Sequence, residues 1–168
     1  NFAYVDKPFP IGFEQTISQP YTVAFQTQAL EIKAGNKVLE IGSGSGYQTS
    51  ILVSMKAEVY SIERIYELYK KSKRILSILN LMPRKIIWED GYLGSKKDAP
   101  FDKILIAAAC VEIPMNLVQQ LKVGGKMIIP IGNQKNQKMN LITRISKNKI
   151  KKIEMGNFLF VPMLTNKI

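Results

Sequence analysis

The sequence contains no histidine and only one cysteine, Cys110. The lack of histidine excludes a Ser-His-Asp triad and removes the commonest general base and the commonest metal ligand, so we expect no metal site. A lone cysteine excludes a disulfide within the chain, and nothing in the sequence suggests an oxidising compartment. No apolar run approaches the length of a membrane span and no signal peptide is visible. We therefore expect no membrane partner and a cytoplasmic location.

The length of 168 residues fits one domain with a sizeable core, and the hydrophobic content of 46% is typical of globular proteins. The net charge of +11 could indicate nucleic-acid binding. The basic residues are scattered, however, with local clusters over residues 70–74 and 147–152 that are not interleaved with base-stacking aromatics. We interpret them as a solvated face, and we expect a monomer that does not bind nucleic acid.

The strongest motif is the stretch Val38-Leu-Glu-Ile-Gly-Ser-Gly-Ser-Gly46, where a short buried strand runs into a glycine turn and a helix over residues 47–56. This arrangement forms a nucleotide-binding crevice at the carboxyl end of a parallel sheet. The spacing is not the G-x-G-x-x-G of dinucleotide sites, and no P-loop G-K-S/T follows. S-adenosylmethionine fits better, because it carries a sulfonium and an ammonium but no phosphate. The residues of this block that we expect to bind it are Glu40, Gly42, Ser43, Gly44 and Gly46.

A second anchor follows about twenty residues later, where the apolar run Glu58-Val-Tyr-Ser-Ile-Glu63 ends. An acidic residue at this position, at the tip of the next strand, binds ribose hydroxyls in nucleotide folds. Glu40 adds to the same interpretation, since a carboxylate just before the glycines repels a pyrophosphate and attracts a cation. The alternative is a tight strand-to-helix turn with a solvated glutamate at position 63.

The rest of the chain alternates strands and helices and then closes with consecutive strands, which predicts an α/β Rossmann-like fold with a mostly parallel, doubly wound sheet and antiparallel C-terminal strands. Within one domain over residues 1–168 we expect an extended arm (1–14), a cofactor-binding core (15–132) and the antiparallel strands (133–168). Strands are predicted over 37–41, 58–62, 85–88, 103–107, 126–131, 139–145, 150–155 and 158–161. Helices are predicted from Ser18 to about Ile32, after Gly46, over 66–79 and over 114–121.

Taken together, these blocks resemble the protein-L-isoaspartate O-methyltransferase family. The resemblance spans residues 2–164, and the Thr16-Ile17-Ser18 block makes it specific, because most other methyltransferases lack that block. Members of the family usually have a helical segment before the position where this sequence starts. Cys110-Val111 replaces a frequent Ala-Pro, and Tyr21 stands where some members have histidine. The matching blocks are Pro10-Ile-Gly12, Gln15–Tyr21, Val38–Tyr47, Ser61–Arg64, Asp90-Gly91, Leu121–Gly125, Ile129–Gly132 and Phe160-Val-Pro162.

The resemblance implies methyl transfer from S-adenosylmethionine to the free α-carboxylate of L-isoaspartyl residues in damaged proteins and peptides, leaving S-adenosylhomocysteine. The methyl ester then collapses to a succinimide, whose hydrolysis returns some normal aspartate. An α-carboxylate has a pKa of about 3.3–3.7, so it is ionised at neutral pH and needs no general base. This agrees with the absence of histidine.

The resemblance also assigns roles to single residues. Ser18 is expected to orient the acceptor carboxylate, although its spacing alone favours a helix N-cap. Asp90 is expected to bind the adenine amino group, with Gly91 giving close backbone approach, and Gln137 is expected either to close over the cofactor or to be a solvated loop residue. Thr16 and Ile17 complete the expected cofactor site, and Cys110 is interpreted as a small buried residue rather than a nucleophile.

Two other functions stay open from the sequence. A methyltransferase acting on RNA or a small molecule would use the same crevice, although no N/D-P-P-Y/F tetrapeptide typical of base amino-group methylation follows the fourth core strand. A non-catalytic member that binds the cofactor or protein partners is the second alternative. Methyl incorporation into an isoaspartyl peptide, compared with an aspartyl peptide and RNA, separates all three.

Overall fold

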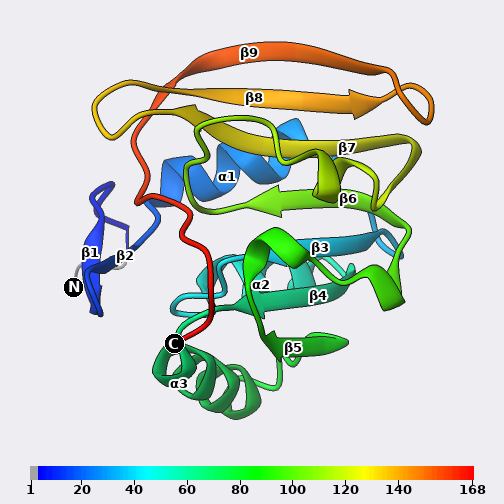
Figure 1. The fold of residues 1–168 in the computed structure, drawn as a ribbon. Coiled ribbons are helices and arrows are strands. Elements are labelled where there is room, and N and C mark those ends of the chain that lie inside the picture. The colour runs from blue at the N-terminus through cyan, green and yellow to red at the C-terminus, as the bar shows by residue number, and fades with distance from the viewer. Residues whose placement is uncertain (1–3) are drawn as a thin grey trace.

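The computed structural model describes residues 4–168 and contains one seven-stranded sheet in the order β5-β4-β3-β6-β7-β8-β9 (Figure 1). The five strands from β5 to β7 are parallel to one another, whereas β8 and β9 are antiparallel to their neighbours. The strands are β3 (Lys37–Ile41), β4 (Glu58–Glu63), β5 (Lys85–Trp88), β6 (Phe101–Ile106), β7 (Leu121–Gly132), β8 (Gln137–Arg144) and β9 (Ile150–Phe158).

Helices connect these strands and cover both faces of the sheet. They are α1 (Pro20–Ala29), α2 (Tyr47–Ser54), α3 (Tyr66–Ile78) and α4 (Met115–Val118), with 3-10 turns at Gly91–Leu93 and Lys96–Asp98. The predicted fold class, a mostly parallel Rossmann-like sheet with antiparallel C-terminal strands, is confirmed. The predicted hairpin is the pair β8 and β9.

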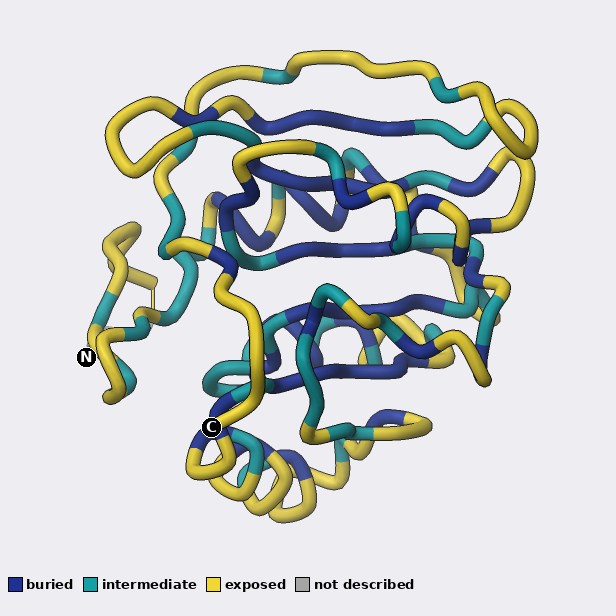
Figure 2. The backbone as a smooth tube through the Cα atoms, viewed as in Figure 1, coloured by how far each residue is buried: buried dark blue, intermediate teal, exposed yellow. Residues whose placement is uncertain are grey.

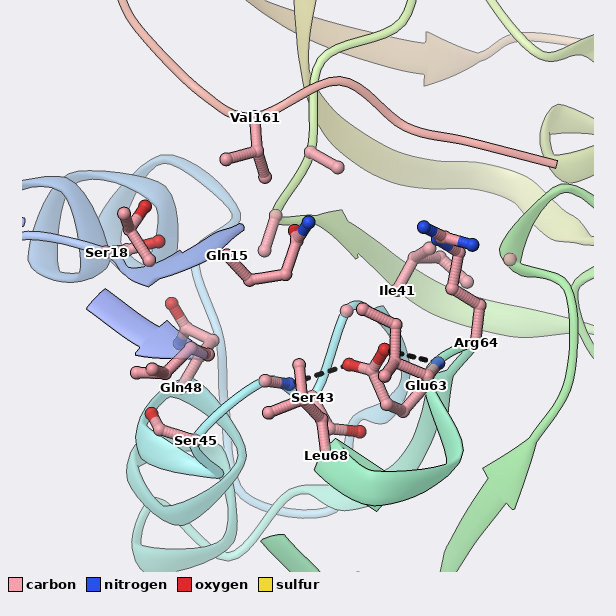
Figure 3. Close-up of a pocket in the computed structure, with 18 of the residues that line it drawn as sticks. Gln15, Ser18, Ile41, Ser43, Ser45, Gln48, Glu63, Arg64, Leu68 and Val161 are labelled. Atoms are coloured by element: carbon pink, nitrogen blue, oxygen red, sulfur yellow. Dashed lines mark hydrogen bonds between the residues drawn. The ribbon is translucent and has the colours of Figure 1, made fainter. Parts of the chain in front are cut away.

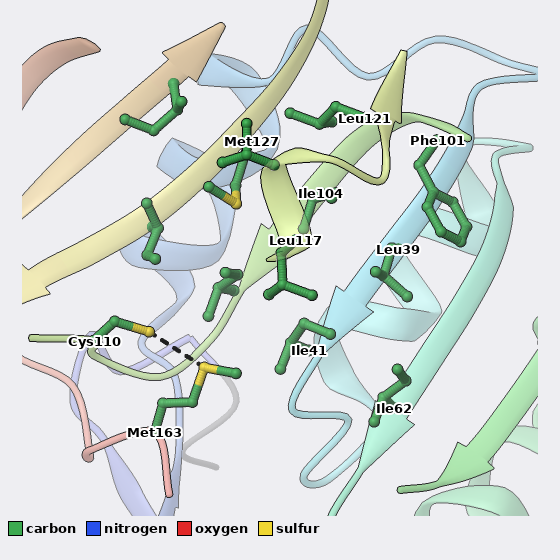
Figure 4. Close-up of a cluster of buried hydrophobic side chains, with 14 of the residues drawn as sticks. Leu39, Ile41, Ile62, Phe101, Ile104, Cys110, Leu117, Leu121, Met127 and Met163 are labelled. Atoms are coloured by element: carbon green, nitrogen blue, oxygen red, sulfur yellow. Dashed lines mark hydrogen bonds between the residues drawn. The ribbon is translucent and has the colours of Figure 1, made fainter. Parts of the chain in front are cut away.

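The strands form because successive apolar side chains point to opposite faces of the sheet. In β3, Val38 joins the cluster that packs under α1 and α2, while its neighbour Leu39 joins the cluster that packs under α4 (Figure 4). Val59 and Tyr60 divide in the same way in β4. Burying one such side chain contributes roughly 1.5–3 kcal/mol. A slip of one residue would move every side chain of the strand to the opposite face of the sheet, so packing fixes the register.

The strands at the centre of the sheet are the most buried, and exposure increases toward its edges. The inner strands are buried along most of their length, whereas β9 and the outer turns of α3 are exposed (Figure 2). In α3 the buried positions Leu68, Ser72 and Leu76 repeat at helical spacing, and the basic residues between them face solvent. The basic cluster over residues 70–74 is therefore on the exposed side of this helix.

Three predicted boundaries are wrong. The helix expected over 114–121 is only the short α4, and β7 begins at Leu121 rather than at residue 126 because the Gly124-Gly125 segment continues as strand. No separate strand covers residues 158–161. Instead β9 continues to Phe158, and the chain beyond it makes only a single parallel bridge between Pro162 and Ala109.

The N-terminal segment is also more ordered than a plain extended arm. Residues 1–3 lie outside the described part of the chain, but β1 (Phe9–Gly12) pairs with β2 (Gln15–Ile17) in a small antiparallel ladder separate from the main sheet (Figure 1). This ladder leads directly into α1 and places residues 16–18 at the carboxyl edge of the main sheet.

The start of α1 corrects the prediction for Ser18. The N-cap residue is Gln19, whose side chain makes no capping hydrogen bond, and Pro20 is the first helical residue. The free amide of Tyr21 instead donates to Asp6 Oδ1 at 3.0 Å. Asp6 therefore satisfies the helix start from outside the helix, and the capping role expected of Ser18 is wrong. The helix also ends earlier than predicted, at Ala29.

Candidate active site

The glycine turn between β3 and α2 adopts backbone conformations that side chains rarely allow. Gly42, Gly44 and Gly46 have φ values of 94°, 52° and 84°. The turn is tied to the next strand through a 2.6 Å hydrogen bond between Ser43 Oγ and Ser61 Oγ. Gly42, Ser43 and Gly44 thereby line a cavity at the carboxyl edge of the sheet, where ligands of this fold class bind.

Glu63 ends β4 beside this turn and is held by two backbone amides (Figure 3). Gly44 N–H donates to Oε2 and Ile65 N–H donates to Oε1, each at 2.9 Å. The residue is 5% exposed and lines a cavity. An ionised carboxylate offers about four acceptor sites, so roughly two remain for ligand hydroxyls after these bonds.

Glu40 lies in β3, fully buried behind the glycine turn rather than on the cavity wall. Thr49 Oγ1 donates to Oε2 at 2.6 Å, while Oε1 has no hydrogen-bond partner within residues 4–168. Burial raises the pKa of Glu40 to about 7, and the nearby charge of Glu63 acts in the same direction. A cation bound in the cavity would favour the ionised form.

The cavity at this edge holds about 800 Å³ of empty space, part of it open to solvent. Its walls come from the β1–β2 ladder, the glycine turn, the end of β4 and the C-terminal segment over residues 161–164 (Figure 3). Eight of the residues expected from the sequence line it: Thr16, Ile17, Ser18, Gly42, Ser43, Gly44, Glu63 and Gly91. Four do not, namely Glu40, Gly46, Asp90 and Gln137.

Both carboxylate oxygens of Asp90 accept hydrogen bonds from backbone amides. Oδ1 accepts from Tyr92 N at 2.8 Å, which caps the 3-10 turn at Gly91–Leu93, and Oδ2 accepts from Asn166 N at 2.8 Å. This placement does not bring the carboxylate to the cavity wall, so it gives no support to the expected contact with adenine. Gly91 does line the cavity, and a Cβ there would lie 2.5 Å from Ile41 Cγ2.

Gln137 lies in β8 and is 2% exposed, so it is neither a loop residue nor solvated. Its Nε2 donates to Phe160 O at 3.0 Å, and its Oε1 accepts from Phe160 N at 2.7 Å. The side chain thus clamps the segment after β9 and does not close over the cavity as the sequence reasoning expected.

The main feature that sequence reasoning missed is the C-terminal segment itself. Val161, Pro162, Met163 and Leu164 line the cavity, and the chain then runs along the end of β4. There Ile168 N–H donates to Arg64 O at 2.9 Å, and Ile168 O accepts from Tyr66 N at 2.7 Å. The Phe160-Val-Pro162 block was the available signal, but it was interpreted as a strand.

Ser18 lies between β2 and α1 at the junction of two hollows. It lines the main cavity and also a smaller one formed with Pro8, Gln19 and Leu159. Among the described residues, Ser18 Oγ has no hydrogen-bond partner. The hydroxyl is therefore free to donate to a group that enters from the smaller hollow.

Cys110 is a buried thiol rather than a nucleophile. Its Sγ lies 3.3 Å from Met163 Sδ in the core (Figure 4), and burial raises the pKa of the thiol to about 11. Within residues 4–168, no group of three or more histidine, cysteine, aspartate and glutamate side chains could hold a metal ion. No helix in the same range is long and apolar enough to cross a membrane.

Comparisons with known proteins agree with this geometry. The protein-L-isoaspartate O-methyltransferases of Christiangramia forsetii and Flavobacterium psychrophilum are 54% and 52% identical over 165 and 167 residues. The alignments cover 98% and 99% of this chain but 77% and 78% of those relatives.

A solved structure of a protein from Plasmodium falciparum, described as a protein-L-isoaspartate O-methyltransferase in complex with S-adenosyl-L-homocysteine, superimposes with a TM-score of 0.87 at 29% identity. The match covers 97% of this chain and 82% of that one. The family model described as protein-L-isoaspartate(D-aspartate) O-methyltransferase matches residues 1–168. The chain belongs to the protein-L-isoaspartate(D-aspartate) O-methyltransferase family.

Proposed function

We propose that this chain transfers a methyl group from S-adenosylmethionine to the α-carboxylate of L-isoaspartyl residues in proteins and peptides. The observation that carries the proposal is Ser18, a hydroxyl with no hydrogen-bond partner in the described chain, placed where the main cavity meets a second hollow. The main cavity suits the cofactor, and the second hollow suits a peptide that presents its carboxylate to Ser18.

The residues present fit a cationic nucleoside. Glu63 offers its remaining acceptor sites to ribose hydroxyls, and Gly91 lets Ile41 and Met163 pack closely against the backbone at the cavity wall. Glu40 lies buried behind the glycine turn, and its Oε1 has no hydrogen-bond partner within residues 4–168. Burial makes the charged carboxylate unfavourable, and a positive charge in the cavity would make ionisation of Glu40 easier. Two carboxylates at this edge would repel a pyrophosphate.

Catalysis in this site depends on orientation. When bound, S-adenosylmethionine supplies a methyl group on positively charged sulfur. Ser18 donates a hydrogen bond to the substrate carboxylate and fixes the direction of its free oxygen, while the segment over residues 161–164 forms one wall of the cavity. Holding two reactants in line can lower a barrier by about 7–11 kcal/mol. The substrate needs no deprotonation, because its pKa of about 3.3–3.7 leaves it ionised at neutral pH.

A paired experiment tests the role of Ser18. Because Asp6 supplies the helix cap, Ser18→Ala should leave the unfolding midpoint and cofactor affinity close to wild type. Turnover of an isoaspartyl peptide should fall roughly a hundredfold, the effect of losing one oriented donor. Asp6→Ala is the matched control and should cost about 1 kcal/mol of stability while the folded enzyme keeps its turnover. Full turnover in Ser18→Ala would move the orienting role to backbone amides.

The proposed setting is a cytoplasmic monomer. The buried free thiol of Cys110 is compatible with a reducing compartment, where disulfides are rare. The exposed edge strand β9 carries Lys151, Lys152 and Glu154, and charged residues on an edge oppose pairing with another copy. Sedimentation equilibrium at micromolar concentration should give the mass of one chain, and a dimer mass would contradict the proposed monomer.

A further inference from the structure

Gln48 presents a buried acceptor that the protein itself does not satisfy. It lies in the first turn of α2, is 6% exposed and lines the cavity. Its Nε2 donates to Thr27 Oγ1 at 3.0 Å, whereas its Oε1 has no hydrogen-bond partner within the described chain. Buried polar atoms are nearly always paired in folded proteins, so an unpaired oxygen beside a ligand cavity indicates a partner supplied by the ligand.

The orientation of this amide is fixed by its neighbour. Thr27 Oγ1 donates its only hydrogen to Val23 O at 2.7 Å, so toward Gln48 it can only accept. The amide NH₂ of Gln48 must therefore face Thr27, and the carbonyl oxygen must face away from it. A flipped amide would place two acceptors against each other.

The place of Gln48 along the cavity indicates which ligand group it meets. Gln48 contacts α1, which packs against the end of β6 through Gln26 and Ile106, whereas Glu63 ends β4 on the other side of β3. Figure 3 accordingly shows Gln48 on the same side of the cavity as Ser18, with Glu63 and Arg64 on the opposite side.

S-adenosylmethionine has hydrogen-bond donors at its two ends. The adenosine carries the ribose hydroxyls and the adenine amino group, and the methionine part carries an ammonium. If Glu63 holds the ribose and the methyl group faces Ser18, the methionine part lies at the Gln48 side. Glu63 is the one acidic residue among the described residues that line the cavity, so no wall carboxylate is present at that side. Among the cavity-lining residues that the structure describes, Gln48 Oε1 is the side-chain acceptor that is both buried and unpaired.

We propose that Gln48 Oε1 accepts a hydrogen bond from the ammonium group of S-adenosylmethionine and thereby positions the methyl group before Ser18. The inference rests on the proposed function, since it assumes that the nucleoside lies on Glu63. Gln48 is a positioning residue in this account, and its effect should appear in the binding of any ligand that carries the methionine ammonium.

The test compares two ligands on Gln48→Met, which keeps the length of the side chain and removes the acceptor. S-adenosylhomocysteine carries the amino-acid part, while 5′-methylthioadenosine keeps the nucleoside and thioether but lacks the ammonium. By calorimetry, the variant should bind S-adenosylhomocysteine at least tenfold more weakly, since the lost bond is to a charged group. Its affinity for 5′-methylthioadenosine should change less than twofold.

Controls separate this effect from distortion of the fold. Gln26→Met removes another buried glutamine, which is 1% exposed, donates to Ile106 O and does not line the cavity. It should lower stability but leave the ratio of the two affinities unchanged. Gln48→Glu keeps an acceptor but gives up the amide that donates to Thr27, so it should be less stable than wild type. Its affinity for S-adenosylhomocysteine relative to 5′-methylthioadenosine should nevertheless stay at or above that of wild type, which tests the inference independently if Gln48→Met folds poorly.

Several results would overturn the inference. Equal weakening of both ligands would show a general distortion of the cavity, and an unchanged ratio would show that Gln48 does not meet the ammonium. A raised KM for the peptide with unchanged S-adenosylhomocysteine affinity would assign Gln48 to the acceptor substrate instead. Failure of the wild type to bind S-adenosylhomocysteine at all would contradict the proposed function itself, so the two failures are distinguishable.

Discussion

Replacing Glu63 with alanine should affect both the fold and the cofactor, and the structure allows the two effects to be separated. The carboxylate accepts one backbone N–H from Gly44 and one from Ile65. A hydrogen bond to a charged group contributes about 1.5–3 kcal/mol, so about 3–6 kcal/mol of unfolding free energy depends on the pair. Both residues line the cavity, where water can replace part of the lost acceptor, although Ile65 is only 3% exposed.

We therefore expect Glu63→Ala to lose about 3 kcal/mol of unfolding free energy, near the low end of that range. A domain of this size has a total stability of about 5–15 kcal/mol, so the variant should still fold. Loss of the ribose contacts should weaken S-adenosylhomocysteine binding by a further 2 kcal/mol or about thirtyfold in Kd, because these bonds are also charge-assisted.

Denaturant unfolding measures the first effect, and calorimetry on the folded variant measures the second. Glu89→Ala is the matched control, because Glu89 is a neighbouring carboxylate that binds Asp90 N and Lys167 without lining the cavity. Its Kd should stay within twofold of wild type. An unchanged Kd in Glu63→Ala would remove Glu63 from the cofactor site and leave it a purely structural role.

Three further predictions follow from the same site. Because burial raises the pKa of Glu40 from 4.5 to about 7, the folded state keeps a proton that the unfolded state has lost, so stability should fall between those pH values by on the order of 3 kcal/mol. Denaturant melts at several pH values should show that Glu40→Gln removes this fall in stability with pH. An equal fall in the variant would show that Glu40 does not cause it. Gly91→Ala places a Cβ 2.5 Å from Ile41 Cγ2 and 3.0 Å from Met163 Cε, so it should cost about 1–3 kcal/mol in a melt and weaken S-adenosylhomocysteine binding. Turnover should survive chelation, because the acceptor is already anionic, and loss of turnover restored by a divalent ion would contradict this.

Much of the fold could be predicted from local patterns. The alternation of Val38 and Leu39 between two cores, the glycine turn after Ile41 and the helical spacing of Leu68 and Leu76 each act within a few residues. Such patterns fix strand faces, turns and helix faces because they depend on backbone geometry and burial alone. The glycine turn and Glu63 lie together as expected because adjacent parallel strands end at the same edge.

The contacts that the sequence did not predict depend on partners far away along the chain. Asp90 binds the amide of Asn166, and Gln137 binds both backbone groups of Phe160. Neither partner is visible in the local pattern around Asp90 or Gln137. The cap of α1 is a similar case, since Asp6 reaches the amide of Tyr21 from across a hairpin.

Other features were hidden because they arise only when the chain folds back on itself. The segment over residues 161–164 lines the cavity after crossing from β9, and the sequence offers only a short apolar run for it. The unpaired oxygen of Gln48 is equally invisible in the sequence, because it depends on Thr27 using its hydrogen elsewhere. Both features require the packing of several elements.

The most direct measurement of the central claim is methyl incorporation from radiolabelled S-adenosylmethionine into an isoaspartyl peptide, its aspartyl twin and RNA. The aspartyl twin differs only in which carboxyl group joins the chain, so it controls for all other contacts. We predict base-labile label in the isoaspartyl peptide alone, and roughly a hundredfold less of it with Ser18→Ala. Label in RNA, equal label in both peptides or no label in any of them would contradict the account.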